Sequence, residues 1–255
     1  MLILLPPSEG KTGGGRGRPV DLANLSLPEL TPARERVLGE LVGRCGTDPV
    51  AAAGLLGLGP TQDDEVVRNA GLRSAAARPA IAVYSGVLYD ALDFDTLGAP
   101  AKSLLRRTTL IFSGLWGAVR LTDRIPAYRC SVGVTMPGLG GLGAYWRREM
   151  TPVMNAAAGG GLVIDLRSGA YQAMWVPPGA ATIRVLHERM VGGVPTRTVV
   201  SHFNKATKGR ILRDLAQAGA RPKSVAKLAD ALRDLKYRVE TPDRPNQLDV
   251  VVAEL

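Results

Sequence analysis

The sequence is poor in the residues that build metal or redox sites. Among its 255 residues, Cys45 and Cys130 are the only cysteines, and His187 and His202 are the only histidines. Their spacing matches neither a zinc site nor a CxxC redox motif. Two cysteines so far apart do not make a disulfide framework. We therefore predict no bound metal and no cofactor.

Long apolar runs are also missing. Residues 1–6 are too few for the apolar part of a signal peptide, and no basic segment precedes them. No run approaches the roughly 20 apolar residues of a membrane-spanning helix. Aromatic residues make up only 5% of the chain, so the core must consist mainly of Leu, Val, Ile and Ala. These absences predict a cytoplasmic protein without a membrane partner.

The chain does have enough apolar material for a folded domain, together with an excess of positive charge. Hydrophobic residues make up 45% and charged residues 22%, which is ordinary for a globular protein. The 32 Lys+Arg against 23 Asp+Glu give a formal net charge of +9. Such a charge favours a polyanionic partner, nucleic acid before membrane. Only seven of the cations are lysine, so part of the arginine excess can reflect GC-rich coding DNA.

Apolar periodicity and turn residues predict interleaved strands and helices. We expect strands at residues 2–5, 81–84, 110–112, 162–166 and 248–252, and a hairpin of residues 181–187 and 196–202. We expect helices at residues 34–44, 87–93, 144–157, 207–218 and 224–235, with weak helical character between residues 51 and 78. Thr31 is the expected N-cap of the first helix. Since no repeat or linker divides residues 1–255, we predict a single mixed α/β (α+β) domain with a mixed β-sheet.

The first polar segment follows directly after the first predicted strand. It contains Gly-Lys-Thr, but a P-loop needs a glycine five positions before Gly10, where Leu5 stands. Three glycines then follow, and they do not open a stable helix. Backbone amides and a lysine on a strand-end loop nevertheless suit an anion. The candidate binding residues are Ser8, Glu9, Lys11 and Thr12, and a solvated loop is the alternative interpretation.

Two further segments combine charged and small residues. Residues 113–129 carry Arg120, Asp123, Tyr128 and Arg129. Arginine holds phosphate or carboxylate through two parallel hydrogen bonds, and Asp123 could orient an arginine or act as a base. The alternative is a surface loop with a structural Arg–Asp pair.

The other segment ends the predicted strand at residues 162–166. Asp165, Arg167, Ser168 and Tyr171 follow that strand, at the edge where open α/β sheets bind ligands. A turn that uses Asp165 and Ser168 as caps is the alternative.

A basic region near the C-terminus is the fourth candidate. Residues 201–238 contain ten basic and three acidic residues. The candidate binding residues are Asn204, Lys205, Lys208, Arg210 and Lys223. Lys205 and Lys208 lie beside a predicted helix N-terminus, where backbone amides favour an anion. The helices within residues 206–236 resemble a helix-hairpin-helix that binds the DNA backbone, although the usual Gly-hydrophobic-Gly turn is missing; a solvated face is the alternative.

Several motifs in this order resemble the YaaA family of peroxide stress proteins, also called UPF0246 or DUF328. The matching elements are the strand and Lys-Thr loop at residues 2–12, the Gly-x-x-Tyr element at 86–89, the Ser-Gly-Leu-aromatic-Gly signature with its Arg, Asp and Tyr-Arg at 113–129, the Tyr-Trp pair at 145–146, the strand end at 165–171 and the Lys-x-x-Lys-Gly element at 205–209. The resemblance covers nearly the whole chain.

Two parts of the chain depart from the enterobacterial pattern of the family. In the first loop, Glu9 is an addition to the enterobacterial Ser-Pro-Ala-Lys-Thr, and residues 233–255 also differ.

The resemblance implies a peroxide-stress protein that lowers available iron and limits oxidative damage to DNA. It also implies binding of duplex or damaged DNA through a positively charged cleft and a helix-hairpin-helix-like element. It does not explain the effect on iron, because the chain shows no visible motif for an all-oxygen iron site.

The residues leave three functions open. One is a DNA-binding protective protein, whose affinity should fall steeply with salt. The second is an enzyme acting on a small nucleotide, a nucleoside or damaged nucleic acid by N-glycosidic or phosphoester hydrolysis. Its candidate catalytic residues are Lys11, Arg120, Asp123, Asp165 and Lys205, with an aspartate as general base and the lysines on phosphate. The third is a scaffold or interaction protein, in which alanine at Lys11, Arg120 and Lys205 would change only the stability.

Overall fold

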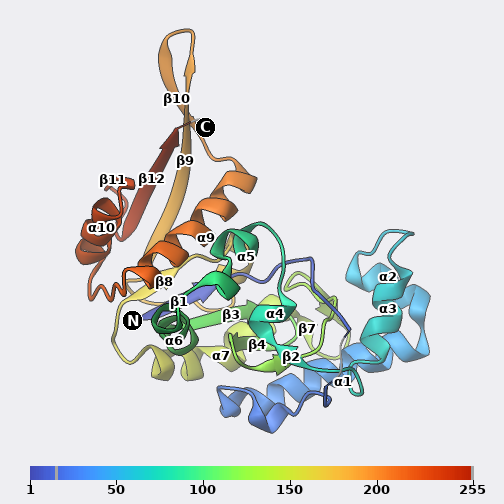
Figure 1. The fold of residues 1–255 in the computed structure, drawn as a ribbon. Helices are drawn as coiled ribbons and strands as arrows, with labels where there is room; N and C mark the ends of the chain where they lie inside the picture. Colours follow the sequence, from blue (N-terminus) through green and yellow to red (C-terminus); the bar gives the residue numbers. More distant parts are fainter. Residues whose placement is uncertain (15–16, 254–255) are drawn as a thin grey trace.

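An eight-stranded mixed β-sheet forms the centre of the fold (Figure 1). The computed structural model describes residues 1–14 and 17–253, apart from the side chains of residues 201 and 202. The strand order is β11-β12-β9-β8-β1-β3-β4, and β10 pairs with the far end of β9. The strands are β1 (Leu2–Leu5), β3 (Thr109–Ser113), β4 (Gly117–Arg120), β8 (Val163–Asp165), β9 (Ala181–Val191), β10 (Val194–Thr198), β11 (Arg238–Glu240) and β12 (Gln247–Ala253).

Five strands in the middle of this sheet run parallel. They are β12, β9, β8, β1 and β3, while β11, β10 and β4 are antiparallel to their neighbours. All four residues of β1 are buried, as expected for a parallel strand that is covered on both faces. The chain leaves β1 for β3 on one side and later returns to β8 on the other. The carboxyl ends of β1 and β8 therefore form a topological switch point, where such sheets usually open a crevice.

Helices cover both faces and one edge of the sheet. They are α1 (Thr31–Thr47), α2 (Pro49–Leu56), α3 (Asp63–Ala70), α4 (Ala80–Val83), α5 (Val87–Leu92), α6 (Ala99–Thr108), α7 (Leu142–Ala158), α8 (Gly169–Gln172), α9 (Ser201–Gln217) and α10 (Val225–Asp234). Helices α9 and α7 lie on opposite sides of the central strands (Figure 1). Helix α1 lies against the β4 edge, where the buried Arg34 donates hydrogen bonds to the carbonyl oxygens of Trp116 and Ala118. That contact satisfies edge carbonyls that would otherwise be buried without partners.

One hydrophobic core joins residues from β1 to β12, and the fold is single-domain-like. Trp116, Trp146 and Trp175 are among its largest fully buried side chains, and aliphatic residues make up most of the rest. Within the described part of the chain, no helix is long and apolar enough to span a membrane.

Most predicted elements are confirmed, and the predicted mixed sheet is present. The strand predicted at residues 81–84 is wrong, because these residues belong mainly to the helical turn α4. The strand nearby is only β2 (Arg78–Pro79), paired with β5 (Arg124–Ile125). A four-residue apolar run does not distinguish a buried strand from a buried helical turn. Here Ala80 and Ile81 donate backbone hydrogen bonds to Asp123 and Leu121 as the chain turns into α4.

Two predicted boundaries also need correction. Thr31 is the first residue of α1 rather than its cap, because a 3₁₀ turn at Pro28–Leu30 runs directly into the helix. Strand β10 ends at Thr198, and α9 begins at Ser201, so the last residues predicted as a strand are helical. Helix α6 and the short strands β4 and β11 were not predicted.

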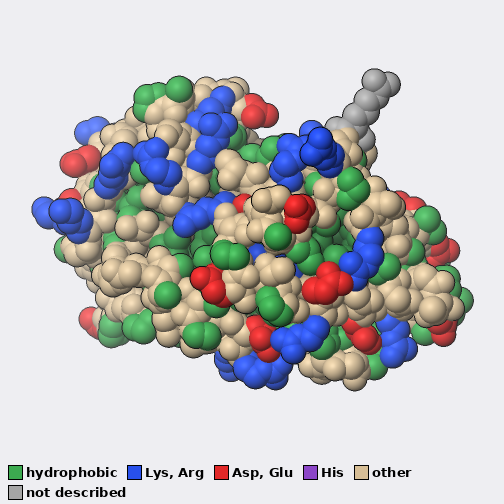
Figure 2. Space-filling model, turned by 90° about the horizontal axis from the view of Figure 1, so that it is seen from below, with side chains coloured by type: hydrophobic (Ala, Val, Ile, Leu, Met, Phe, Trp, Pro, Cys, Tyr) green, Lys and Arg blue, Asp and Glu red, His purple; other side chains and the backbone are tan. Residues whose placement is uncertain are grey.

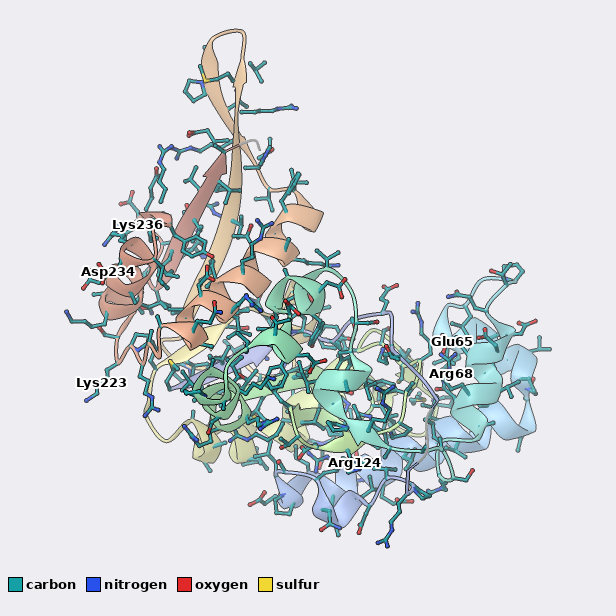
Figure 3. All side chains as sticks on the ribbon, in the orientation of Figure 1. Glu65, Arg68, Arg124, Lys223, Asp234 and Lys236 are labelled. Carbon is teal, nitrogen blue, oxygen red and sulfur yellow. The ribbon has the colours of Figure 1, made fainter. Side chains whose placement is uncertain are left out.

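The helix-hairpin-helix is not confirmed. Two helices are present, α9 and α10, and residues 218–224 join them with Gly219 at a positive φ of 63°. Helix α9 packs mainly against α5 and β9, whereas α10 packs mainly against β11. Lys223, on the joining loop, points outward from the body of the protein (Figure 3).

Candidate functional site

A cleft of about 630 Å³ opens at the carboxyl ends of β1 and β8, at the topological switch point. Five separate segments line it: residues 6–11 after β1, 85–89 around the start of α5, 129–131, 166–171 after β8, and 204–208 of α9. The volume lies within the usual range for small-ligand sites, roughly 300–1,000 Å³. The sheet topology and the cavity thus point to the same place.

The charged side chains lining the cleft are mostly positive. Lys11, Arg129, Lys205 and Lys208 come from three of the lining segments. Among the described lining residues, Glu9 is the one acidic side chain. Serine, asparagine and tyrosine side chains supply neutral hydrogen-bonding groups around them. This combination suits a ligand that carries phosphate or carboxylate groups.

Lys11 is the most perturbed of these cations. Its Nζ donates a hydrogen bond to the carbonyl oxygen of Ser8 at 2.8 Å and lies 4.5 Å from the centroid of the Tyr128 ring. Its backbone bridges to Tyr84, which ties the first loop to the start of α5. Burial, and secondly the positive charge of Arg129, lower the pKa of Lys11 to about 8. About a tenth of this amine is therefore neutral at pH 7, and the rest is charged.

Tyr128 supports Lys11 from beneath and does not line the cleft. Its hydroxyl lies 2.6 Å from Oγ of Ser113 and 2.9 Å from the hydroxyl of Tyr84. Ser113 Oγ in turn accepts a hydrogen bond from the backbone N–H of Trp116 at 2.9 Å. This buried network fixes the ring over which the Lys11 ammonium lies. The Ser113 and Tyr128 positions of the family signature are explained by this support.

Arg129 is held by its backbone, so its side chain can face the cleft. The buried side chain of Asn69, on α3, accepts a hydrogen bond from the Arg129 N–H at 2.9 Å and donates one to its carbonyl oxygen at 2.7 Å. Nη2 of Arg129 lies 3.5 Å from Oε2 of Glu9, whose side chain is 89% exposed. Exposed pairs of this kind contribute little stability, so an anionic ligand can replace Glu9 as the partner of Arg129.

Asp165 and Arg167 form a buried pair behind the wall of the cleft. The guanidinium of Arg167 donates two hydrogen bonds of 2.8 and 2.7 Å to the Asp165 carboxylate, and the Arg167 N–H donates a third at 3.0 Å. Arg167 also donates to the carbonyl oxygens of Tyr171 at 3.0 Å and Trp175 at 2.7 Å. The pair thus fixes the loop that presents Ser168 and Tyr171 to the cleft, and neither charged residue lines the cleft itself.

A close helix contact positions the two lysines of α9. A Cβ atom at Gly209 would lie 2.2 Å from the carbonyl oxygen of Leu88, so only glycine lets α9 approach α5 this closely. Lys205 and Lys208 stand just before it on the cleft side of the helix. Nζ of Lys208 lies 3.4 Å from the carbonyl oxygen of Leu166. Burial lowers the pKa of Lys208, and the nearby Asp165 partly opposes that shift.

The structure brings together about half of the residues predicted from the sequence. Those lining the cleft are Ser8, Glu9, Lys11, Arg129, Ser168, Tyr171, Asn204, Lys205 and Lys208. Those outside it are Thr12, Arg120, Asp123, Tyr128, Asp165, Arg167, Arg210 and Lys223. Lys223 lines a depression beside Met1 and Leu162, at the amino ends of β1 and β8 and thus at the opposite edge of the sheet.

Asp123 closes a turn at a distance from the cleft. Its carboxylate accepts hydrogen bonds from the Ser26 hydroxyl at 2.8 Å and from the Arg120 N–H at 2.9 Å. Arg120 itself donates to the carbonyl oxygen of Arg107. Asp123 and Asp165 therefore do not share the cavity that a joint catalytic role requires.

Sequence reasoning missed the segment at residues 85–89. The Ser85 N–H donates to Oγ of Ser8 at 3.1 Å, and the Tyr89 hydroxyl donates to the carbonyl oxygen of Pro6 at 2.7 Å. The segment therefore fixes the first loop as well as lining the cleft. The Gly-x-x-Tyr element at residues 86–89 is the feature of the sequence that marks this segment.

Comparison with known proteins gives one consistent result. The chain matches the sequence model of the family described as "Peroxide stress protein YaaA" over residues 1–242. It is 56% identical over 265 residues to a UPF0246 protein from Streptomyces coelicolor, with both chains fully covered. It is 45% identical over 255 residues to a UPF0246 protein from Corynebacterium efficiens, covering 99% of this chain and all of that protein. An uncharacterized protein from Campylobacter jejuni is 27% identical over 215 residues, or 83% of each chain.

Proposed function

The chain belongs to the YaaA family of peroxide stress proteins, and we propose that it binds DNA by holding one sugar–phosphate unit in the cleft between β1 and β8. One observation carries this proposal. Lys11, Arg129, Lys205 and Lys208 converge on one cavity from separate parts of the chain, with Glu9 as the acidic residue among them. Binding there would shield damaged DNA and limit further oxidative damage.

The size of the cleft favours a local contact with DNA. About 630 Å³ accommodates a single nucleotide but not a duplex. A nucleotide reaches such a cavity when it is terminal, unpaired or rotated out of the stack. Rotation costs least where a base is damaged or mismatched. We therefore expect distorted or damaged DNA to bind more tightly than intact duplex.

The charge outside the cleft is more diffuse. Arg213 pairs with Asp93 at 3.5 Å, and Arg238 pairs with Glu188 at 2.7 Å, so part of the C-terminal basic excess is neutralised. On the face drawn in Figure 2, lysine and arginine side chains form several separate groups with acidic side chains between them. The cleft cations are thus the best candidates for specific phosphate contacts.

Hydrolysis of a nucleotide or damaged nucleic acid is the second candidate function. A cavity of ligand size and a lysine with a lowered pKa favour it. The proposed carboxylate bases are less favourable, because Asp123 is bound to Ser26 and Asp165 is paired with Arg167. Among the described residues that line the cleft, Glu9 carries the one carboxylate that a hydrolytic mechanism could use as a base. DNA binding needs no such base, and we therefore place it first.

The lowering of available iron remains a prediction from the resemblance. Within the described residues, no group of three or more His, Cys, Asp and Glu side chains is arranged to hold a metal ion. Our proposal for this chain therefore concerns DNA.

The test compares two exposed lysines at opposite edges of the sheet. Fluorescence anisotropy with a short duplex, intact or carrying an abasic site, measures affinity across a salt series. Lys205→Ala removes a cleft cation, and Lys223→Ala is the matched control. We expect Lys205→Ala to weaken binding roughly tenfold, as for the loss of one charge-assisted contact. For this variant, the negative slope of log K against log salt concentration should become less steep by about 0.9.

The Lys223→Ala control distinguishes DNA binding in the cleft from DNA binding at the loop between α9 and α10. If Lys223→Ala weakens binding while Lys205→Ala does not, DNA contacts the loop and the cleft proposal is wrong. If neither variant changes the affinity or the salt slope, the proposal fails as well. Unchanged circular dichroism of both variants shows that a difference comes from the interface.

A further inference from the structure

We propose that Lys11 is an amine nucleophile that captures the aldehyde of a base-free deoxyribose as a reversible imine. The inference rests on the proposed binding of DNA in the cleft, and it names the chemistry of the damaged unit held there. Loss of a base from DNA leaves a sugar whose open form carries an aldehyde at C1′. The captured lesion would be shielded until water releases it.

The position of Lys11 fits this role. Lys11 lines the cleft beside the carboxyl end of β1, and the Ser8 carbonyl and the Tyr128 ring fix the direction of its amine. An abasic sugar carries a phosphate on each side. Arg129 and Lys205 line the same cavity and can hold those phosphates, so a bound sugar presents its C1′ to the amine.

The protonation state of Lys11 suits nucleophilic attack. An amine attacks a carbonyl only when it is neutral, and enzymes activate lysine by burial and by a neighbouring cation. Both influences act on Lys11, and they lower its pKa to about 8. About a tenth of the side chain is therefore neutral at pH 7, against well under a thousandth for an ordinary lysine.

The reaction balances without an oxidant or a reductant. The lone pair of the neutral amine forms a bond from Nζ to C1′, and the aldehyde oxygen takes up protons. The two amine protons leave with that oxygen as water, and a C=N double bond remains. Tyr171 lines the same cleft, and its hydroxyl can pass a proton to the leaving oxygen, because burial keeps it protonated by raising its pKa to about 12. Addition of water reverses the sequence.

Other nucleophiles in the cleft are less suited. Burial lowers the pKa of Lys208 as well, but the carboxylate of Asp165 opposes that shift and Nζ of Lys208 lies 3.4 Å from the Leu166 carbonyl oxygen. Cys130 also lines the cleft, but burial raises the pKa of its thiol to about 12. The thiolate needed for attack is therefore scarce.

Borohydride trapping tests the inference on the full chain. An imine is reduced by sodium borohydride to a stable amine, so the adduct survives a denaturing gel and mass spectrometry. One probe is a duplex with a single abasic site, and the second is 2-deoxyribose 5-phosphate. We expect adducts with both, mapped to Lys11 by peptide mass, and faster trapping as the pH rises from 7 to 8. Lys11→Arg should abolish the adduct at that position, while Lys223→Ala should leave it unchanged.

The two probes separate this inference from the proposed function. Binding of the abasic duplex without a trapped adduct overturns the imine and leaves DNA binding standing. Trapping of the sugar phosphate at Lys11 without DNA binding supports the amine and refutes the proposed function. Adducts spread over exposed lysines, or retained at full level in Lys11→Arg, overturn the inference. Peptide mapping of the adduct on the original protein, without any substitution, keeps the test decisive even if a variant folds poorly.

Discussion

Replacing Lys11 with methionine should make the protein more stable at neutral pH. The ammonium is buried beside Arg129, and its pKa falls from 10.5 to about 8. At 1.36 kcal/mol per unit, that fall corresponds to roughly 3 kcal/mol of destabilisation below pH 8. Methionine has a similar length and no charge, but it loses the hydrogen bond to Ser8, worth about 1 kcal/mol. We therefore expect Lys11→Met to raise the free energy of unfolding by about 1–3 kcal/mol at pH 7.

The sign of the pH dependence gives a sharper test. Because the pKa of this group is lower in the folded than in the unfolded chain, the unfolded chain binds more protons between about pH 8 and 10.5. The Lys11 contribution to stability therefore rises with pH through this window. The advantage of Lys11→Met should be largest below pH 8 and should shrink as the pH approaches 10.

Urea unfolding at several pH values from 7 to 10, followed by circular dichroism, measures the difference between the two proteins. Lys223→Met is the control, because the side chain of this lysine points outward (Figure 3) at the opposite edge of the sheet. A stability of Lys11→Met below that of the original chain at pH 7 would refute the reasoning. So would an advantage that stays constant across this pH range.

Two further substitutions test the supports of the cleft. In Gly209→Ala the new methyl meets the Leu88 carbonyl, so we expect a loss of about 1–3 kcal/mol by urea unfolding and weaker DNA binding by anisotropy. Gly43→Ala in α1 has free space and is the control; equal behaviour of the two variants would contradict the tight contact. Asp165→Asn leaves Arg167 buried without its partner and should cost roughly 3–5 kcal/mol in the same assay. A near-normal melting curve for Asp165→Asn would contradict the structural role.

The sheet was largely predictable because its central strands are buried on both faces. Such strands appear in the sequence as short apolar runs ended by Pro, Gly or polar residues, as in β1, β3 and β8. The run at residues 81–84 has the same composition, yet most of it is the helical turn α4. Its conformation depends on hydrogen bonds to a segment about 40 residues away, which a local pattern does not contain.

The position of the cleft was predictable in part, but the set of residues that line it was not. Polar residues after a buried strand mark the edge where ligands bind, and residues 8–11 and 168–171 do line the cleft. Asp123 and Asp165 both lie in segments that combine charged and small residues, but their side chains bind different partners in the structure. Ser26 lies 97 positions from Asp123, so the contact that removes Asp123 from the candidate site is invisible in the local sequence. Lys223 belongs to the same basic region as Lys205, yet the loop turns it to the other edge.

The family motifs therefore combine two kinds of residue that the sequence alone does not separate. Tyr128 lies beneath Lys11, and Asp165 holds Arg167, which fixes the loop that carries Tyr171. Lys11 and Tyr171 themselves line the cleft. The supports have their hydrogen bonds satisfied inside the protein, so replacing them should mainly reduce stability. Lys11 differs, because its buried charge opposes folding below pH 8 and a well-packed apolar residue would be more stable there. A destabilising lysine that lines a cavity together with other cations is better explained by reaction with a ligand than by the stability of the fold.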